Sequence, residues 1–406
     1  MHSTSPLSPL RLEKDDSLIK IYHQKIGVWA LAQCLILFGF AAQAQQLSPE
    51  ATISLITIGP TQKELYSAFG HSAIRVYDPQ QPLDYFYNYG VFSFNQPNFY
   101  LNFARGINYY QLGVYDYPPY RDYYIRENRF IHEQILNLTT EQKQRVFNFL
   151  ERNALPENKM YLYDYFYDNC ATRPRDVLKN VLGDDIAFDN SPEKKTITIR
   201  GLTDIFLSQQ PWGDLGIDIC LGLPMDKKAS RTEYMFLPDS LESGFDRAKV
   251  KSDSVWMALV AEKKSVFQSN PIQPVFSIFH PWIVFGILSL GIVGISIRDW
   301  RRKVITRWPD KIILFLTGGL GVLLLLLWFL TSHKAAANNL NILWAIPTNL
   351  VFPFIDKARK KYFLVITALT GGLLLCWFLL PQQLHVFLIP LVIAFGVRYW
   401  INYKLI

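Results

Sequence analysis

Short stretches in which apolar and polar residues alternate characterise the chain from residue 46 to residue 274. Alternation of this kind places one face of a strand in a core and the other toward solvent, so it predicts β-strands. The predicted strands cover residues 52–58, 72–77, 84–90 and 132–138. We therefore expect a globular α+β domain that contains a sheet.

Two helices are predicted in the same region. The first runs from Thr139 to about Asn153 and begins with the sequence of a capping box. The second covers residues 170–182. Its Pro174 is compatible with a helix only in the first turn, so Cys170 must lie close to the helix N-terminus.

Long apolar runs replace the alternating pattern from residue 275 onward. Each run approaches the roughly 20 residues that cross the core of a bilayer. The predicted spans are residues 275–297, 312–331, 340–355, 362–380 and 384–401. We therefore expect an all-α polytopic membrane domain over residues 275–406, after an exported domain over residues 46–274.

The charged residues around these runs indicate how the chain is oriented in the membrane. Basic residues gather in the loops 298–311 and 357–361, whereas the loops 332–339 and 381–385 hold one lysine between them. Basic loops stay in the cytoplasm, which places residues 46–274 outside. The net charge of +7 arises in the membrane region, so nucleic acid is not an expected partner.

The first 45 residues resemble a leader. An apolar stretch at 26–40 follows two lysines and precedes Ala42-Gln43-Ala44. This order is typical of a secretory signal, with cleavage expected after Ala44; the alternative is a retained sixth span. Either interpretation exports the domain, and we expect the bacterial inner membrane with the domain on the periplasmic side.

Two residues of the exported domain have the chemistry of a thiol enzyme. Cys170 lies at a helix N-terminus, where the helix dipole favours the nucleophilic thiolate. His71 follows a glycine at the start of a strand and is the candidate base, whereas His132 is interpreted as structural. We expect the free N–H groups of the helix to bind the oxyanion of a tetrahedral intermediate.

A third group usually orients the histidine of such a pair. If residues 72–77 and 84–90 form a hairpin, the second strand returns Asn88 to the neighbourhood of His71. Asn88 is therefore the candidate orienting residue. Asp164 and Asp168 are the alternatives.

Three motifs together resemble a known family. They are Gly70-His71-Ser72, Asn88-Tyr89-Gly90 and the segment 163–173, which contains Asp168-Asn169-Cys170-Ala171-Thr172-Arg173. A histidine that precedes an Asn-Cys pair resembles the circularly permuted papain-like (NlpC-type) superfamily. The whole set is more closely similar to the exported domain of the Lnb-type lipoprotein N-acyltransferases, whose polytopic members append a membrane domain.

The resemblance implies an activity. A fatty acyl chain would move from a membrane phospholipid to the α-amine of a diacylated lipoprotein, with Cys170 as the acylated nucleophile and His71 as its base. No cofactor and no metal are expected. Two alternatives remain at this point: a papain-like hydrolase of cell-wall peptides, and a non-catalytic binding or sensor protein in which Cys170 and Cys220 form a disulfide.

Further residues are candidates for binding the substrates. Arg173 and Arg175 follow the nucleophile and are expected to hold the donor phosphate. Tyr167 and His333 are also expected to bind substrate, His333 from an external loop between two spans. A tyrosine-rich loop at 109–124 is expected to rest on the bilayer, because tyrosine favours the membrane–water interface.

Overall fold

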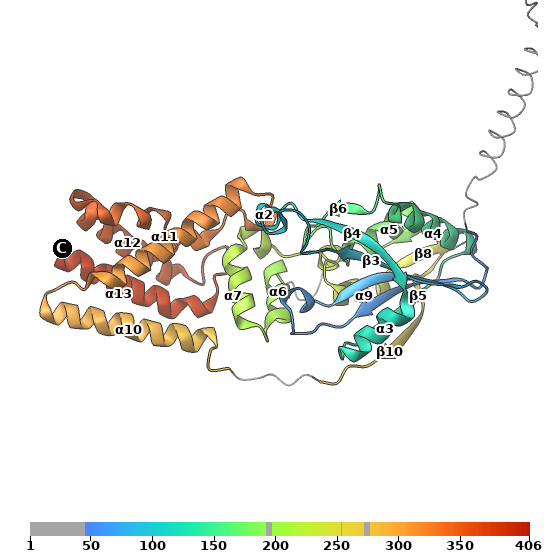
Figure 1. Cartoon of the computed structure of the whole chain (residues 1–406), viewed down its shortest axis with the longest axis horizontal. Helices are drawn as coiled ribbons and strands as arrows, with labels where there is room; N and C mark the ends of the chain where they lie inside the picture. Colours follow the sequence, from blue (N-terminus) through green and yellow to red (C-terminus); the bar gives the residue numbers. More distant parts are fainter. Residues whose placement is uncertain (1–44, 192–196, 253, 272–276) are drawn as a thin grey trace, which may run out of the picture. The chain divides into compact units, whose positions relative to one another are not determined.

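The computed structural model describes residues 45–191, 197–252, 254–271 and 277–406 (Figure 1). The predicted leader and its cleavage site after Ala44 lie outside these residues. Residues Leu47–Ile406 form one compact unit.

A seven-stranded antiparallel sheet forms the centre of the exported domain, in the order β10-β5-β1-β2-β3-β4-β6 (Figure 1). Its strands are β1 (Thr52–Ile58), β2 (His71–Asp78), β3 (Leu83–Val91), β4 (Tyr109–Asp116), β5 (Ile131–Leu136), β6 (Met160–Leu162) and β10 (Val260–Phe267). The four predicted strands are thereby confirmed. A small second sheet contains β7 (Ile186–Ala187), β8 (Lys249–Ser252) and β9 (Val255–Ala258).

Helices cover both faces of the large sheet. In β1, Ile53 and Leu55 join a core with α4 and α5, whereas Ile56 and Ile58 join a core with α3, as strand alternation requires (Figure 1). The helices of this region are α2 (Phe99–Arg105), α3 (Tyr117–Arg126), α4 (Thr140–Ala154), α5 (Thr172–Leu182), α6 (Ile199–Leu207), α7 (Pro211–Cys220), α8 (Arg231–Tyr234) and α9 (Pro238–Arg247). The predicted capping box of α4 is present: Thr139 and Gln142 bond each other's backbone.

The tyrosine-rich stretch 109–124 is not a loop, and that prediction is wrong. Tyrosine is a good strand former, and Leu112 is buried on the inner face of β4. Pro118 and Pro119 then lie in the first turn of α3, where a proline is tolerated. Tyr117 and Tyr124 of this helix are buried against the sheet.

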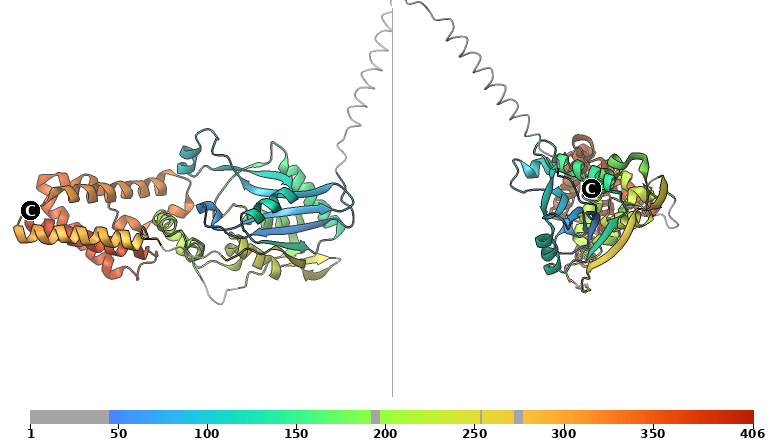
Figure 2. Two further views of the ribbon diagram at one scale, coloured as in Figure 1. Left: turned by 60° about the horizontal axis from the view of Figure 1, so that its bottom comes forward. Right: turned by 90° about the vertical axis from the view of Figure 1, so that its right-hand side faces the viewer.

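The C-terminal region is helical. Its helices are α10 (Pro281–Arg302), α11 (Arg307–Leu330), α12 (Asp356–Cys376) and α13 (Ile389–Leu405), and α10 lies alongside α13 (Figure 2). Among the described residues, three segments are long and apolar enough to cross a membrane: Pro281–Arg302, Arg307–Leu330 and Val386–Leu405. The helix α12 is of similar length, but its first turns carry a charged cluster.

The prediction of a continuous helix over residues 340–355 is wrong. This segment consists of three short 3₁₀-helices, Leu340–Leu343, Pro347–Leu350 and Phe352–Phe354, because its prolines interrupt a regular α-helix. It packs closely on α11: a Cβ at Gly321 would lie 2.0 Å from the Ala345 carbonyl, and one at Gly318 would lie 3.0 Å from the Leu350 nitrogen. The segment therefore runs antiparallel to α11.

The outer loops of the helical region contact α7 and the residue that follows it. Asn339 donates to the carbonyl of Ile219 at 2.8 Å, and Gln382 donates to the carbonyl of Leu221 at 3.0 Å. Leu215 of α7 belongs to the same hydrophobic cluster as α11, α12 and α13. Residues 199–226 of the exported domain thus form packing contacts and hydrogen bonds with the membrane region.

Candidate active site

Cys170 lies at the N-terminal end of α5, as predicted. The α-helix begins at Thr172, so Pro174 falls in its first turn. The preceding Asn169 fixes this turn: its Oδ1 accepts from the N–H groups of Ala171 and Thr172 at 2.8 and 2.9 Å. Because Asn169 occupies these donors, the expectation that they bind the oxyanion is wrong.

His71 and Asn88 meet across the hairpin of β2 and β3. The strands pair from Asp78 and Leu83 up to Ile74 and Tyr87, as the predicted hairpin requires. Asn88 Oδ1 lies 2.6 Å from His71 Nε2. An amide oxygen accepts, so His71 Nε2 carries the proton and Nδ1 is left with a free lone pair.

Cys170 lies close to β3 beyond the end of its pairing with β2. Gly90 has a φ of +93°, and a Cβ there would lie 3.5 Å from Cys170 Cβ. The backbone N–H groups of Ser72 and of Cys170 itself interact favourably with the sulfur and lower its pKa. Cys170 therefore lies beside the residue that follows His71, with two backbone donors near its sulfur.

Burial controls the protonation of the pair. It raises the pKa of the Cys170 thiol to about 11, against the lowering effect of the two N–H groups and Arg129. It lowers the pKa of His71 to about 4, against the raising effect of the Asn88 hydrogen bond. At neutral pH the resting site therefore holds a thiol and a neutral imidazole, and the imidazole is free to accept a proton.

Arg129 is a residue of this site that the sequence analysis missed. Its Nε donates to the carbonyl of Gly59 at 2.6 Å, and its guanidinium lies 5.0 Å from the ring centre of Tyr124. Its Nη2 is buried and has no hydrogen-bond partner. The charge lowers the pKa of both His71 and Cys170. No motif surrounds Arg129, so only the fold reveals its position.

The other predicted site residues have different partners. Arg173 forms an ion pair with Asp168 and lies 3.9 Å from the ring centre of Tyr161. Arg175 pairs with Asp176 at 2.8 Å and donates to the Thr232 carbonyl at 3.1 Å. Both guanidinium groups are therefore already paired within the protein.

Tyr167 and His333 also lie in surroundings of their own. The Tyr167 side chain is exposed, and its backbone N–H donates to Asp164 at 3.2 Å. His333 Nε2 lies 2.9 Å from the Phe103 carbonyl oxygen. Asp164 is a turn-forming residue and Asp168 is paired with Arg173, so Asn88 has the best position of the three candidates for orienting His71.

The structure also decides two points about cysteine and histidine. Cys170 and Cys220 are free thiols, which contradicts the disulfide alternative. His132 pairs with Glu242 at 3.0 Å and stacks on Phe130, which agrees with a structural role. Within the described ranges, no group of three histidine, cysteine, aspartate or glutamate residues is placed to hold a metal ion.

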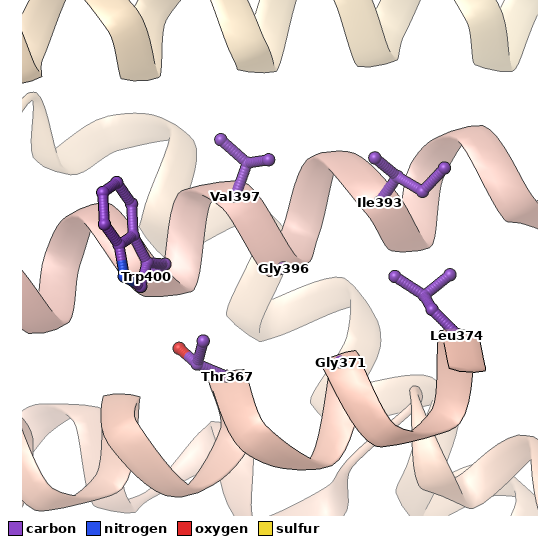
Figure 3. Close-up of a pocket in the computed structure, with 7 residues that line it drawn as sticks. All are labelled: Thr367, Gly371, Leu374, Ile393, Gly396, Val397 and Trp400. Carbon is purple, nitrogen blue, oxygen red and sulfur yellow. The ribbon is translucent and has the colours of Figure 1, made fainter. Parts of the chain in front are cut away.

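An apolar pocket of about 300 Å³ lies between α12 and α13 (Figure 3). Its lining residues are Thr367, Gly371, Leu374, Ile393, Gly396, Val397 and Trp400. None of them titrates or acts as a nucleophile, so the pocket has no catalytic chemistry of its own.

Comparison with known proteins identifies two domains. Residues 41–204 match the family model of the Lnb N-terminal periplasmic domain, and this match includes His71, Asn88, Arg129 and Cys170. Residues 273–406 match the family model of the Lnb transmembrane domain. No curated protein and no solved structure matches the chain.

Proposed function

This chain belongs to the Lnb-type family of lipoprotein-modifying membrane enzymes, and on that premise we propose that it transfers a fatty acyl chain from a membrane phospholipid to the N-terminal amine of diacylated lipoproteins. The observation that carries the proposal is the hydrogen bond between His71 and Asn88 next to Ser72, whose N–H interacts with the free thiol of Cys170. The expected location is the bacterial inner membrane, with the catalytic domain on the periplasmic side.

The first half of the reaction acylates the enzyme. His71 Nδ1 accepts the proton of the Cys170 thiol as the sulfur attacks the ester carbonyl of the phospholipid. The N–H groups of Ser72 and Cys170 stabilise the oxyanion of the tetrahedral intermediate. The imidazolium then returns its proton to the departing alkoxide, which leaves a thioester on Cys170 and a free lysophospholipid.

The second half transfers the chain. The α-amine of the lipoprotein attacks the thioester carbonyl, and His71 accepts one proton from the attacking nitrogen. Collapse of the intermediate breaks the carbon–sulfur bond, forms the amide and returns the proton to the sulfur. The thioester divides one difficult ester-to-amide exchange into two easier steps, which is the purpose of a covalent nucleophile.

Mass spectrometry of lipoprotein N-terminal lipopeptides tests the proposal. Cells with the wild-type protein, without it, with Cys170→Ser and with Cys220→Ser are compared. Cys220 is the matched control, since it is a second free thiol of the same domain. We expect Cys170→Ser to lower N-acylation by about 10³-fold or more, as loss of a nucleophile does, and Cys220→Ser to preserve it.

Identical lipopeptides in all four strains would contradict the proposal. The cell-wall hydrolase would then be the next hypothesis, because it uses the same cysteine and histidine on a peptide bond. Its test is the release of wall peptides by the wild-type protein and by Cys170→Ser.

A further inference from the structure

The segment of residues 92–105, which we call the aromatic segment, exposes an unusual amount of apolar surface. Its helix α2 (Phe99–Arg105) contains no buried residue. Tyr100 is 76% exposed, Leu101 57% and Phe103 53%, and Phe94 in the preceding loop is 58% exposed. Large exposed apolar patches of this kind mark interaction sites in proteins.

The aromatic segment is attached to the outer end of a membrane span. The helix α11 ends at Leu330. The N–H of Ser332 donates to the Arg105 carbonyl at 2.9 Å, and His333 Nε2 lies 2.9 Å from the Phe103 carbonyl oxygen. A Cβ at Gly106 would lie 3.0 Å from the His333 nitrogen, so this position needs glycine for the close approach. The segment therefore lies at the expected membrane surface.

Aromatic rings connect this segment to the candidate nucleophile. The ring centres of Phe103 and Phe99 are 6.3 Å apart, and those of Phe99 and Phe92 are 6.0 Å apart. The row continues from Phe92 to Tyr110 at 4.8 Å and from Tyr110 to Tyr163 at 4.2 Å. All four pairs are stacked.

The row ends beside Cys170. A Cβ at Gly90 would lie 3.7 Å from the Tyr163 ring and 3.5 Å from Cys170 Cβ. The glycine thus leaves space between the last ring and the thiol. The row of rings therefore ends at the glycine that Cys170 also approaches.

We propose that the aromatic segment inserts into the outer leaflet of the bilayer and guides a fatty acyl chain of a phospholipid along this row to Cys170. The inference rests on the proposed acyltransferase function. Tyrosine favours the membrane–water interface, and phenylalanine and leucine are side chains that interfacial helices bury at the acyl boundary. Arg105 is the only charged residue of the segment. A surface with one cation and no carboxylate suits a phospholipid, because every phospholipid headgroup contains an anionic phosphate.

Photo-crosslinking tests contact with lipid without any need for catalysis. The photoreactive amino acid p-benzoylphenylalanine replaces Tyr100 in the full-length protein, reconstituted in nanodiscs of phosphatidylethanolamine and phosphatidylglycerol. Trp256 of β9 is the matched control, since it is also an exposed aromatic residue, 46% exposed. We expect phospholipid adducts at position 100 at least about tenfold above those at position 256. Equal adducts at the two positions, or adducts only to protein, would overturn the inference.

A pair of acyl donors tests the guiding role. One is nanodisc phospholipid, and the other is the water-soluble ester p-nitrophenyl butyrate, which releases p-nitrophenol when Cys170 is acylated. The variant Tyr100→Ser/Leu101→Ser/Phe103→Ser is compared with Val255→Ser/Trp256→Ser/Met257→Ser, which removes exposed apolar residues from β9. We expect the ratio of the bilayer rate to the soluble rate to fall about tenfold in the first variant only.

The outcomes separate this inference from the proposed function. An unchanged ratio in the first variant, with Cys170 still acylated by both donors, overturns the guiding role alone. Failure of the wild-type protein to acylate Cys170 with either donor overturns the proposed function, and this inference with it.

Discussion

Buried arginines in the membrane region and in the candidate active site differ in how fully they are paired. Arg398 of α13 is completely buried and bonds Asp310 at 2.6 Å, Asp299 at 2.9 Å and the Thr306 carbonyl at 2.6 Å. Arg129 is nearly as buried, but its Nε bonds one carbonyl and its Nη2 has no partner. A buried unpaired donor is costly. We infer that Arg398 stabilises the fold and propose that Arg129 takes part in the reaction.

The surroundings explain why the two regions differ. The cluster around Arg398 lies where the turn between α10 and α11 meets α13, and Asp299 and Asp310 are both buried there, so each charge is paired inside the protein. The candidate active site holds a neutral thiol and a neutral imidazole in its resting state, so neither of these two groups balances the charge of Arg129. In the proposed reaction a thiolate and an oxyanion form, and we expect the charge of Arg129 to stabilise both.

The largest expected effect is a loss of stability when the complete cluster is broken. Arg398→Met removes the buried cation from Asp310 and leaves Asp299 with the partly exposed Arg298, which should lower the free energy of unfolding by about 3–5 kcal/mol. Thermal unfolding of the purified protein in detergent measures this. The control is Arg359→Met, because its partner Asp356 is 88% exposed and an exposed pair contributes about 0–1 kcal/mol. Equal effects of the two variants would contradict the structural role of Arg398.

Arg129→Met should act mainly on the reaction. We expect the rate of acyl transfer to fall about 10–100-fold, as for the loss of one electrostatic contribution to a transition state, with a smaller effect on unfolding than Arg398→Met. The pH profile supplies the specific readout. Because the cation lowers the pKa of His71, its removal should raise that pKa above about 4 and move the acid limb of the rate to higher pH.

Arg129→Lys is the control for this prediction, since it keeps the charge. Its acid limb should stay close to that of the wild-type protein. If Arg129→Met lowers stability and activity together and leaves the acid limb in place, Arg129 is a structural residue like Arg398.

Asn88→Ala should have the smallest effect of the three. We expect a fall of about tenfold in the rate, because His71 loses the acceptor that fixes its tautomer. The Asn88 hydrogen bond raises the pKa of His71, so its removal should move the acid limb to lower pH, opposite to Arg129→Met. Asn153→Ala is the control. Asn153 of α4 accepts a hydrogen bond from the hydroxyl of Tyr89, which follows Asn88 on β3, so this variant also removes an asparagine acceptor. A shift to higher pH in Asn88→Ala would exclude the proposed orientation of His71.

The sequence predicted the parts of the site that depend on local pattern. Alternation located β2 and β3, their hairpin located Asn88 near His71, and Pro174 located Cys170 at the start of α5. These predictions succeed because strand period, hairpin pairing and the helix position of proline are short-range properties.

The features that sequence analysis missed depend on long-range packing. Arg129 becomes part of the site because β5 lies beside β1 in the sheet, which brings residue 129 to Gly59. The row from Phe103 to Tyr163 joins residues from α2, β4 and the segment before Cys170, and no local pattern indicates that they stack. The prediction of a loop at 109–124 was wrong because a tyrosine-rich loop at an interface and a tyrosine-rich strand in a sheet have the same composition.

The irregular segment of residues 340–355 has a consequence for biogenesis. Its backbone lacks the continuous hydrogen bonding of an α-helix, and lipid supplies no donors or acceptors in exchange. Asn349 bonds Thr317 of α11 at 2.8 Å, and the glycines of α11 admit the segment closely. Such a segment is not expected to insert into the bilayer on its own. The helix α11 must already be in the bilayer to receive it, so the order of synthesis along the chain is also the order in which this part of the membrane region has to assemble.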